Sequence, residues 1–151
     1  MNAFHYPGTD SSSSEPMNRL IADIAKAING EYQAIGYYEA LARLAPTEKE
    51  RTSIREIRRD EIKHYKLFLR IYKKLTGHRP MVMEGSPPEN YRQGLKFSIE
   101  DELETVDFYL DISDRAYDPR IRRAFRRAAL DEQQHAVTFN YFLTKLCCKD
   151  P

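Results

Sequence analysis

Apolar residues recur every three or four positions along four long segments of the chain. This spacing is typical of helices that bury one face and expose the other. Helix-ending and helix-capping residues separate the segments: Pro46 follows the first, Gly77 ends the second, and Asp118 with Pro119 opens the fourth. The pattern predicts helices over residues 17–45, 48–76, 91–116 and 119–147.

The connections between these helices are short, long and short. Helices joined by a short loop pack as antiparallel neighbours, so the first two and the last two are expected to form hairpins. The central connection of about 14 residues can stretch roughly 45 Å, whereas a helix of about 26 residues is roughly 39 Å long. We therefore expect an all-α fold over residues 17–148, a four-helix bundle of two antiparallel hairpins joined by a long crossover. Residues 1–16, which contain a serine run, are expected to form a flexible tail.

The two predicted hairpins share a sequence repeat at an offset of 71 residues. Each half reads Glu-x6-Tyr on one helix and Asp-Glu-x2-His on the next, and its two glutamates are 30 residues apart. Agreement of this many polar positions at one fixed offset is unlikely by chance. The repeated pairs are Glu31 and Glu102, Tyr38 and Tyr109, Asp60 and Asp131, Glu61 and Glu132, and His64 and His135.

The four repeated glutamates interrupt apolar stripes near the middle of each helix. Burying a charge without compensation costs several kcal/mol, and like charges repel. Two divalent cations would neutralise four carboxylates, and Glu with His suits iron or manganese. One Glu from each of two helices, with Glu-x-x-His from each of the other two, is an inward-facing di-metal arrangement known in helix bundles. The predicted metal ligands are Glu31, Glu61, His64, Glu102, Glu132 and His135.

Two further questions concern the repeated tyrosines and the third-helix ligand. Tyr38 and Tyr109 lie two turns after Glu31 and Glu102 and are expected to hydrogen-bond a ligand carboxylate; tyrosines that simply pack in the core are the alternative. Redox participation of the two tyrosines is a further possibility. On the third helix, Asp101 and Glu104 share another face and are the alternatives to Glu102 as a ligand.

Composition narrows the function classes. The net charge of +1 lacks the basic surplus of a dedicated nucleic-acid binder. No apolar run approaches the roughly 18 residues of a membrane span, and the polar N-terminus does not look like a signal peptide, so a cytoplasmic protein is expected. The two cysteines, Cys147 and Cys148, are adjacent at the end of the last helix and are expected to be solvent-accessible thiols.

The sequence resembles the rubrerythrin branch of the ferritin-like superfamily over about residues 17–147. The resemblance rests on EYQAIGYYEALA with DEIKH in the first half, and on ELETVDFYLDIS with DEQQH in the second. It implies a ferritin-like bundle in which the six residues named above hold two iron ions. It also implies an enzyme, an oxidoreductase whose reduced di-iron centre reacts with hydrogen peroxide or dioxygen.

Two departures from full rubrerythrins change what is expected. The chain has no paired CxxC motifs of a rubredoxin module, so electrons would come from a separate donor protein. Thr105 occupies the position of a further carboxylate, one turn after the third-helix ligand, which makes the site more similar to that of bacterioferritins. A ferroxidase or iron-handling protein, and a bundle with a purely structural metal, are the alternative functions.

Apolar residues outside the core register bear on assembly. They either complete the bundle core or form the face of a homodimer, and a homodimer is expected. These residues are Phe97, Leu103, Phe108 and Leu110.

Overall fold

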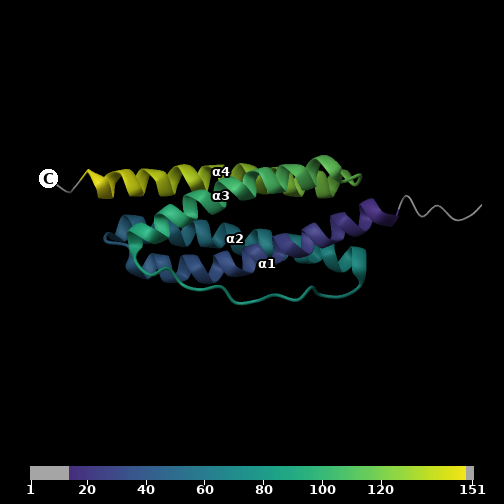
Figure 1. The fold of residues 1–151 in the computed structure, drawn as a ribbon, viewed down its shortest axis with the longest axis horizontal. Helices are drawn as coiled ribbons and strands as arrows, with labels where there is room; N and C mark the ends of the chain where they lie inside the picture. Colours follow the sequence, from purple (N-terminus) through teal and green to yellow (C-terminus); the bar gives the residue numbers. More distant parts are fainter. Residues whose placement is uncertain (1–13, 149–151) are drawn as a thin grey trace, which may run out of the picture.

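The computed structural model describes residues 14–148, which form four long helices and no strand. The helices pack as two antiparallel hairpins, α1 with α2 and α3 with α4, and a long crossover connects the hairpins (Figure 1). The expected all-α four-helix bundle is confirmed. The helix bounds are α1 Ser14–Leu44, α2 Glu48–Thr76, α3 Tyr91–Arg115 and α4 Pro119–Cys147.

The first helix begins three residues earlier than expected. Ser14, Glu15 and Pro16 belong to α1, so the expected tail of residues 1–16 is wrong over these three positions. Proline is tolerated in the first turn of a helix because its missing N–H would be unpaired there. An acidic residue in that turn is also stabilised by the positive end of the helix dipole. Residues 1–13 lie outside the described part of the chain.

Side-chain caps define the other helix starts. Thr47 accepts a hydrogen bond from the Glu50 backbone N–H at 3.2 Å, and Asp118 accepts one from the Arg120 backbone N–H at 2.8 Å. Gly77 ends α2 with φ at 80°, a left-handed conformation that glycine adopts without steric cost. These capping residues determine where the helices begin and end. The helix ends in turn determine which residues of neighbouring helices lie at the same height along the bundle axis.

The apolar core forms two separate clusters. One contains Phe68 and Phe125, whose stacked rings are 4.1 Å apart, and the other contains Leu95 and Phe139. On α1, Ile28 belongs to the first cluster and Tyr38 to the second. The buried glutamates and histidines of the repeat lie on the same helices between these two sets of positions, so the bundle carries a polar layer inside an otherwise apolar core.

The crossover is attached along the outer side of α1 (Figure 1). The Met83 backbone N–H donates to Asn29 Oδ1 at 2.7 Å, and Gln33 Nε2 donates to the Met83 carbonyl at 3.2 Å. Tyr32 donates to Glu84 at 2.7 Å. These hydrogen bonds hold an irregular segment against a helix, so one wall of the molecule next to the polar layer has a defined shape.

Candidate metal centre

The six repeated glutamates and histidines converge at the centre of the bundle, and all are buried. They form two overlapping groups in which one ligand-capable atom of each residue lies within 4.8 Å of the others. Glu61 and Glu132 belong to both groups, so their carboxylates lie between two equivalent positions. The groups are Glu31, Glu61, His64 and Glu132, and Glu61, Glu102, Glu132 and His135.

The two halves have the same local geometry. His64 Nδ1 lies 3.0 Å from Glu132 Oε1 and 3.5 Å from Glu31 Oε1. His135 Nδ1 lies 3.0 Å from Glu61 Oε1 and 3.5 Å from Glu102 Oε2. Each imidazole therefore faces one glutamate from its own half and one from the other half, and the two halves are equivalent in this respect.

The atoms that face the centre lie close to one another, with each histidine Nδ1 3.0 Å from a glutamate oxygen, but form no hydrogen bond of good geometry. Within the described residues, one carboxylate oxygen of each glutamate and the Nδ1 of each histidine are buried without a hydrogen-bond partner. An unsatisfied buried polar atom costs about 1–3 kcal/mol, so six in one place require a further ligand. Carboxylate oxygens and imidazole nitrogens are a suitable donor set for iron or manganese. The residues present therefore fit a pair of metal ions.

Electrostatics supports the same conclusion. Burial, reinforced by the Glu61 carboxylate, raises the pKa of Glu31 and of Glu132 well above the usual range. Burial lowers the pKa of His135, but the carboxylates of Glu102 and Glu61 beside its ring outweigh burial and raise that pKa to about 10. A metal-free cluster therefore retains protons, which divalent cations would displace on binding.

Two aspartates orient the histidines from outside. His64 Nε2 is 3.1 Å from Asp131 Oδ2, and His135 Nε2 is 3.4 Å from Asp60 Oδ2. An Nε2–H that donates to a carboxylate leaves the Nδ1 lone pair facing the centre, the usual arrangement behind a metal-binding imidazole. The repeat had marked Asp60 and Asp131, but sequence reasoning gave them no role.

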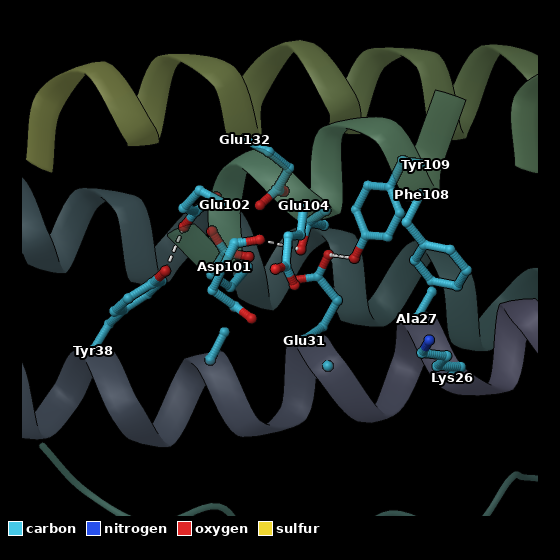
Figure 2. A pocket seen from close by; sticks show the side chains of 14 residues that line it. Lys26, Ala27, Glu31, Tyr38, Asp101, Glu102, Glu104, Phe108, Tyr109 and Glu132 are labelled. Atoms are coloured by element: carbon cyan, nitrogen blue, oxygen red, sulfur yellow. Dashed lines mark hydrogen bonds between the residues drawn. The ribbon is translucent and has the colours of Figure 1, made fainter. Parts of the chain in front are cut away.

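The two repeated tyrosines hydrogen-bond glutamates across the bundle. Tyr38 on α1 donates to Glu102 on α3, and Tyr109 on α3 donates to Glu31 on α1 (Figure 2). Both tyrosines are buried, and each bond fixes one carboxylate oxygen while the second oxygen of the same glutamate faces the centre.

On α3, the structure brings Glu102 into the buried cluster and leaves its two alternatives outside. Asp101 and Glu104 are exposed at the rim of a cavity whose floor includes Glu102. Thr105 also lines this cavity, and its hydroxyl donates to the Asp101 carbonyl at 2.8 Å.

That cavity has a volume of about 310 Å³ and lies between α1 and α3. Glu31 of α1, Glu102 of α3 and Glu132 of α4 line it, and Lys26 and Phe108 stand at one end (Figure 2). The Lys26 ammonium lies 4.9 Å from the centre of the Phe108 ring. The buried carboxylates are therefore accessible to a small molecule from the α1/α3 side.

The structure also shows where the two cysteines and the apolar residues outside the core register lie. Cys147 and Cys148 are exposed. Phe97, Leu103 and Leu110 are exposed on α3, whereas Phe108 is half-buried; a homodimer through this face stays a prediction. Among residues 14–148, no helix is both long and apolar enough to cross a membrane.

A single-crossover helix bundle with a buried, twofold-repeated Glu/His cluster defines a ferritin-like protein. The rubrerythrin family model matches residues 24–92 and 93–149, and the chain therefore belongs to the rubrerythrin family. The two matches fall on the two halves of the repeat.

Two further proteins are similar to this chain. The chain is 42% identical over 144 residues to the uncharacterized protein YhjR of Bacillus subtilis (strain 168), across 95% of this chain and 98% of that protein. Its fold is similar to that of a hypothetical protein from Pyrococcus furiosus, with a TM-score of 0.76. That likeness covers 85% of this chain and 90% of the other at 20% identity, and shows the fold alone.

Proposed function

We propose that this protein is a di-iron oxidoreductase that reduces hydrogen peroxide or reacts with dioxygen. The observation that carries the proposal is the set of six buried carboxylate and imidazole atoms that face one another beside a cavity without forming hydrogen bonds. A purely structural metal would not require the cavity, because a closed site stabilises a fold equally well.

The overlap of the two groups supports a role for each ligand. Glu31 and His64 would hold one ion, and Glu102 and His135 the other. Glu61 and Glu132 belong to both groups and would bind both ions. When bound and reduced, an iron pair supplies the two electrons needed to break one O–O bond. Manganese is the alternative metal for this ligand set.

The protein's own side chains would keep this site in one geometry. Tyr38 and Tyr109 hold the outer carboxylates by hydrogen bonds, and Asp60 and Asp131 hold the imidazoles. The four buried carboxylates would balance the positive charge of the two ions, which changes with their oxidation state during the reaction. Pre-organisation of this kind lowers the reorganisation required at the moment of reaction.

Electrons would come from a separate donor protein, which we expect to be acidic. Helices α2 and α4 together carry 16 Lys and Arg against 7 Asp and Glu, whereas α1 and α3 carry 6 against 11. The basic α2/α4 side is also the side from which Asp60 and Asp131 contact the histidines, and these aspartates are 34% and 27% exposed. An acidic partner would therefore be attracted to the side that leads to the imidazoles.

The test is an anaerobic Fe(II) titration of metal-free protein, followed by successive additions of hydrogen peroxide or air-saturated buffer, with re-reduction by dithionite and removal of the dithionite before each new addition of oxidant. We expect about two irons per chain, oxidation by at least one oxidant, and repeated turnover. A single round of oxidation followed by release or accumulation of ferric iron would support iron handling instead. Tight iron binding without any reaction would indicate a structural metal and contradict the proposal.

A further inference from the structure

A second cavity adjoins the one that reaches the carboxylates. It has a volume of about 460 Å³ and lies between α1, the first turns of α3 and crossover residues 85–89. We term the 310 Å³ cavity the inner cavity and this one the outer cavity. Four residues line both: Gly30, Ala34, Tyr38 and Asp101. The two spaces are therefore neighbours that share a common boundary.

The two cavities are larger than hydrogen peroxide or dioxygen needs. Each of these molecules is comparable in size to one or two waters, and a water occupies about 30 Å³ in the liquid. Cavities of about 300–1,000 Å³ are typical of sites for organic ligands. The inner cavity alone can hold the peroxide group, which leaves the outer cavity without a function in the reduction of hydrogen peroxide.

The lining of the outer cavity suits an uncharged organic group. Tyr37 and Phe97 contribute aromatic rings whose centres are 5.0 Å apart, and Pro87 and Pro88 contribute apolar surface from the crossover. The charged lining residues are Asp101 and Glu89, both acidic. A ligand that carries a carboxylate or phosphate would be repelled, whereas a neutral aromatic or branched alkyl group would be accommodated.

The wall formed by the crossover is closely packed. Gly85 lies so close to Gln33 that an added Cβ would be 3.3 Å from the Gln33 Cβ. At the start of α3, a Cβ on Gly94 would be 2.5 Å from Leu41 Cδ1 and 3.0 Å from Pro88 Cβ. Together with the Met83 hydrogen bonds to Asn29 and Gln33, these approaches give the outer cavity a fixed boundary.

We infer that the outer cavity binds the organic part of a small neutral hydroperoxide, ROOH, whose two oxygens lie in the inner cavity. The inference rests on the proposed function. The O–O bond breaks as ROOH takes up two electrons and two protons, giving ROH and water. The electrons are those of the reduced iron pair, restored by the donor protein.

Gly30 offers a way to separate the two cavities. It lines both, and a Cβ added there meets nothing within 4 Å, so a leucine side chain at this position would extend into the shared space. Gly36 is a matched control, because it lies on the same helix, also has open space around an added Cβ, and lines neither cavity. Circular dichroism and thermal melting would verify that Gly30→Leu and Gly36→Leu both fold.

The first measurement uses metal-free protein and cumyl alcohol, the product of cumene hydroperoxide reduction, observed by NMR. We expect shift changes around Tyr37, Phe97 and Gly85, retained in Gly36→Leu and reduced in Gly30→Leu. Absence of binding at millimolar alcohol, or shifts confined to another part of the molecule, would overturn the inference whatever the fate of the proposed function.

The second measurement compares cumene hydroperoxide with hydrogen peroxide in the iron-loaded protein. We expect both to be reduced, and Gly30→Leu to lower the ratio of their kcat/KM values by about tenfold or more, with the ratio unchanged in Gly36→Leu. Turnover of hydrogen peroxide without turnover of cumene hydroperoxide would overturn the inference and leave the proposed function standing. Binding of cumyl alcohol without turnover of either peroxide would overturn the proposed function and the hydroperoxide reaction, and would leave only an organic-ligand site.

Discussion

Tyr38 on α1 donates its hydroxyl hydrogen bond to Glu102 on α3, and not to Glu31 two turns earlier on its own helix. Its counterpart Tyr109 on α3 donates back to Glu31. Each hairpin therefore fixes a glutamate of the other hairpin. Because the inner cavity opens between α1 and α3, these two bonds also span the side of the bundle from which the carboxylates are accessible.

Removing either hydroxyl should weaken the contact between the hairpins. Tyr38→Phe and Tyr109→Phe each leave one buried carboxylate oxygen unpaired, which should lower the free energy of unfolding by about 1–3 kcal/mol. Urea denaturation of the iron-loaded protein measures this change. Tyr117→Phe is the matched control, since Tyr117 is 87% exposed and should tolerate the change. Equal stability of all three variants would show that the tyrosines only fill space.

The shared glutamates should differ from the unshared ones in metal stoichiometry. Glu61 and Glu132 belong to both ligand groups, so Glu61→Gln or Glu132→Gln should weaken binding at both positions. Glu31→Gln and Glu102→Gln each affect one group and should lower the iron content from about two per chain to about one. Anaerobic titration with metal analysis distinguishes these outcomes. Loss of both irons in all four variants would show that the two positions do not bind independently.

Helical periodicity and the offset of 71 residues were sufficient to predict the bundle and to select the residues that converge. Periodicity shows which face of a helix is buried, but not which residue of another helix lies opposite. The pairs Tyr38–Glu102 and His64–Asp131 depend on how the hairpins meet, and sequence spacing does not contain that information. The two cavities were likewise not predictable, because they depend on how the crossover packs against α1 through Met83 and Gly85.

The aspartates behind the histidines should control metal affinity. Asp60→Asn and Asp131→Asn remove the carboxylate that holds each imidazole Nε2, and changes of this kind typically lower metal affinity about 10–100-fold. Competition with a chelator of known affinity measures the effect. Asp107→Asn is the control, because Asp107 is exposed on α3 and lines neither cavity. An unchanged affinity in both variants would mean that packing alone orients the rings.

Reversal of charge on the basic side should slow electron delivery by an acidic donor. Arg59 on α2 and Arg127 on α4 are 61% and 76% exposed, so Arg59→Glu and Arg127→Glu leave the core closed, although Arg127 also lies 3.7 Å from Asp131, the partner of His64. Stopped-flow reduction of the ferric protein by a reduced, acidic ferredoxin should slow in both variants, and its dependence on ionic strength should weaken. Reduction by dithionite reports whether the centre itself has changed.

Arg43→Glu separates a local effect from one of net charge. Arg43 is 72% exposed and lies in the last turn of α1, outside α2 and α4, so the same change of two charge units there should leave the ferredoxin rate near that of the unmodified protein. An equal slowing in all three variants would show that the donor responds to total charge. A donor that docks on α2/α4 instead responds to Arg59 and Arg127 alone, because the attraction between exposed charges falls off over about 8–10 Å at physiological salt.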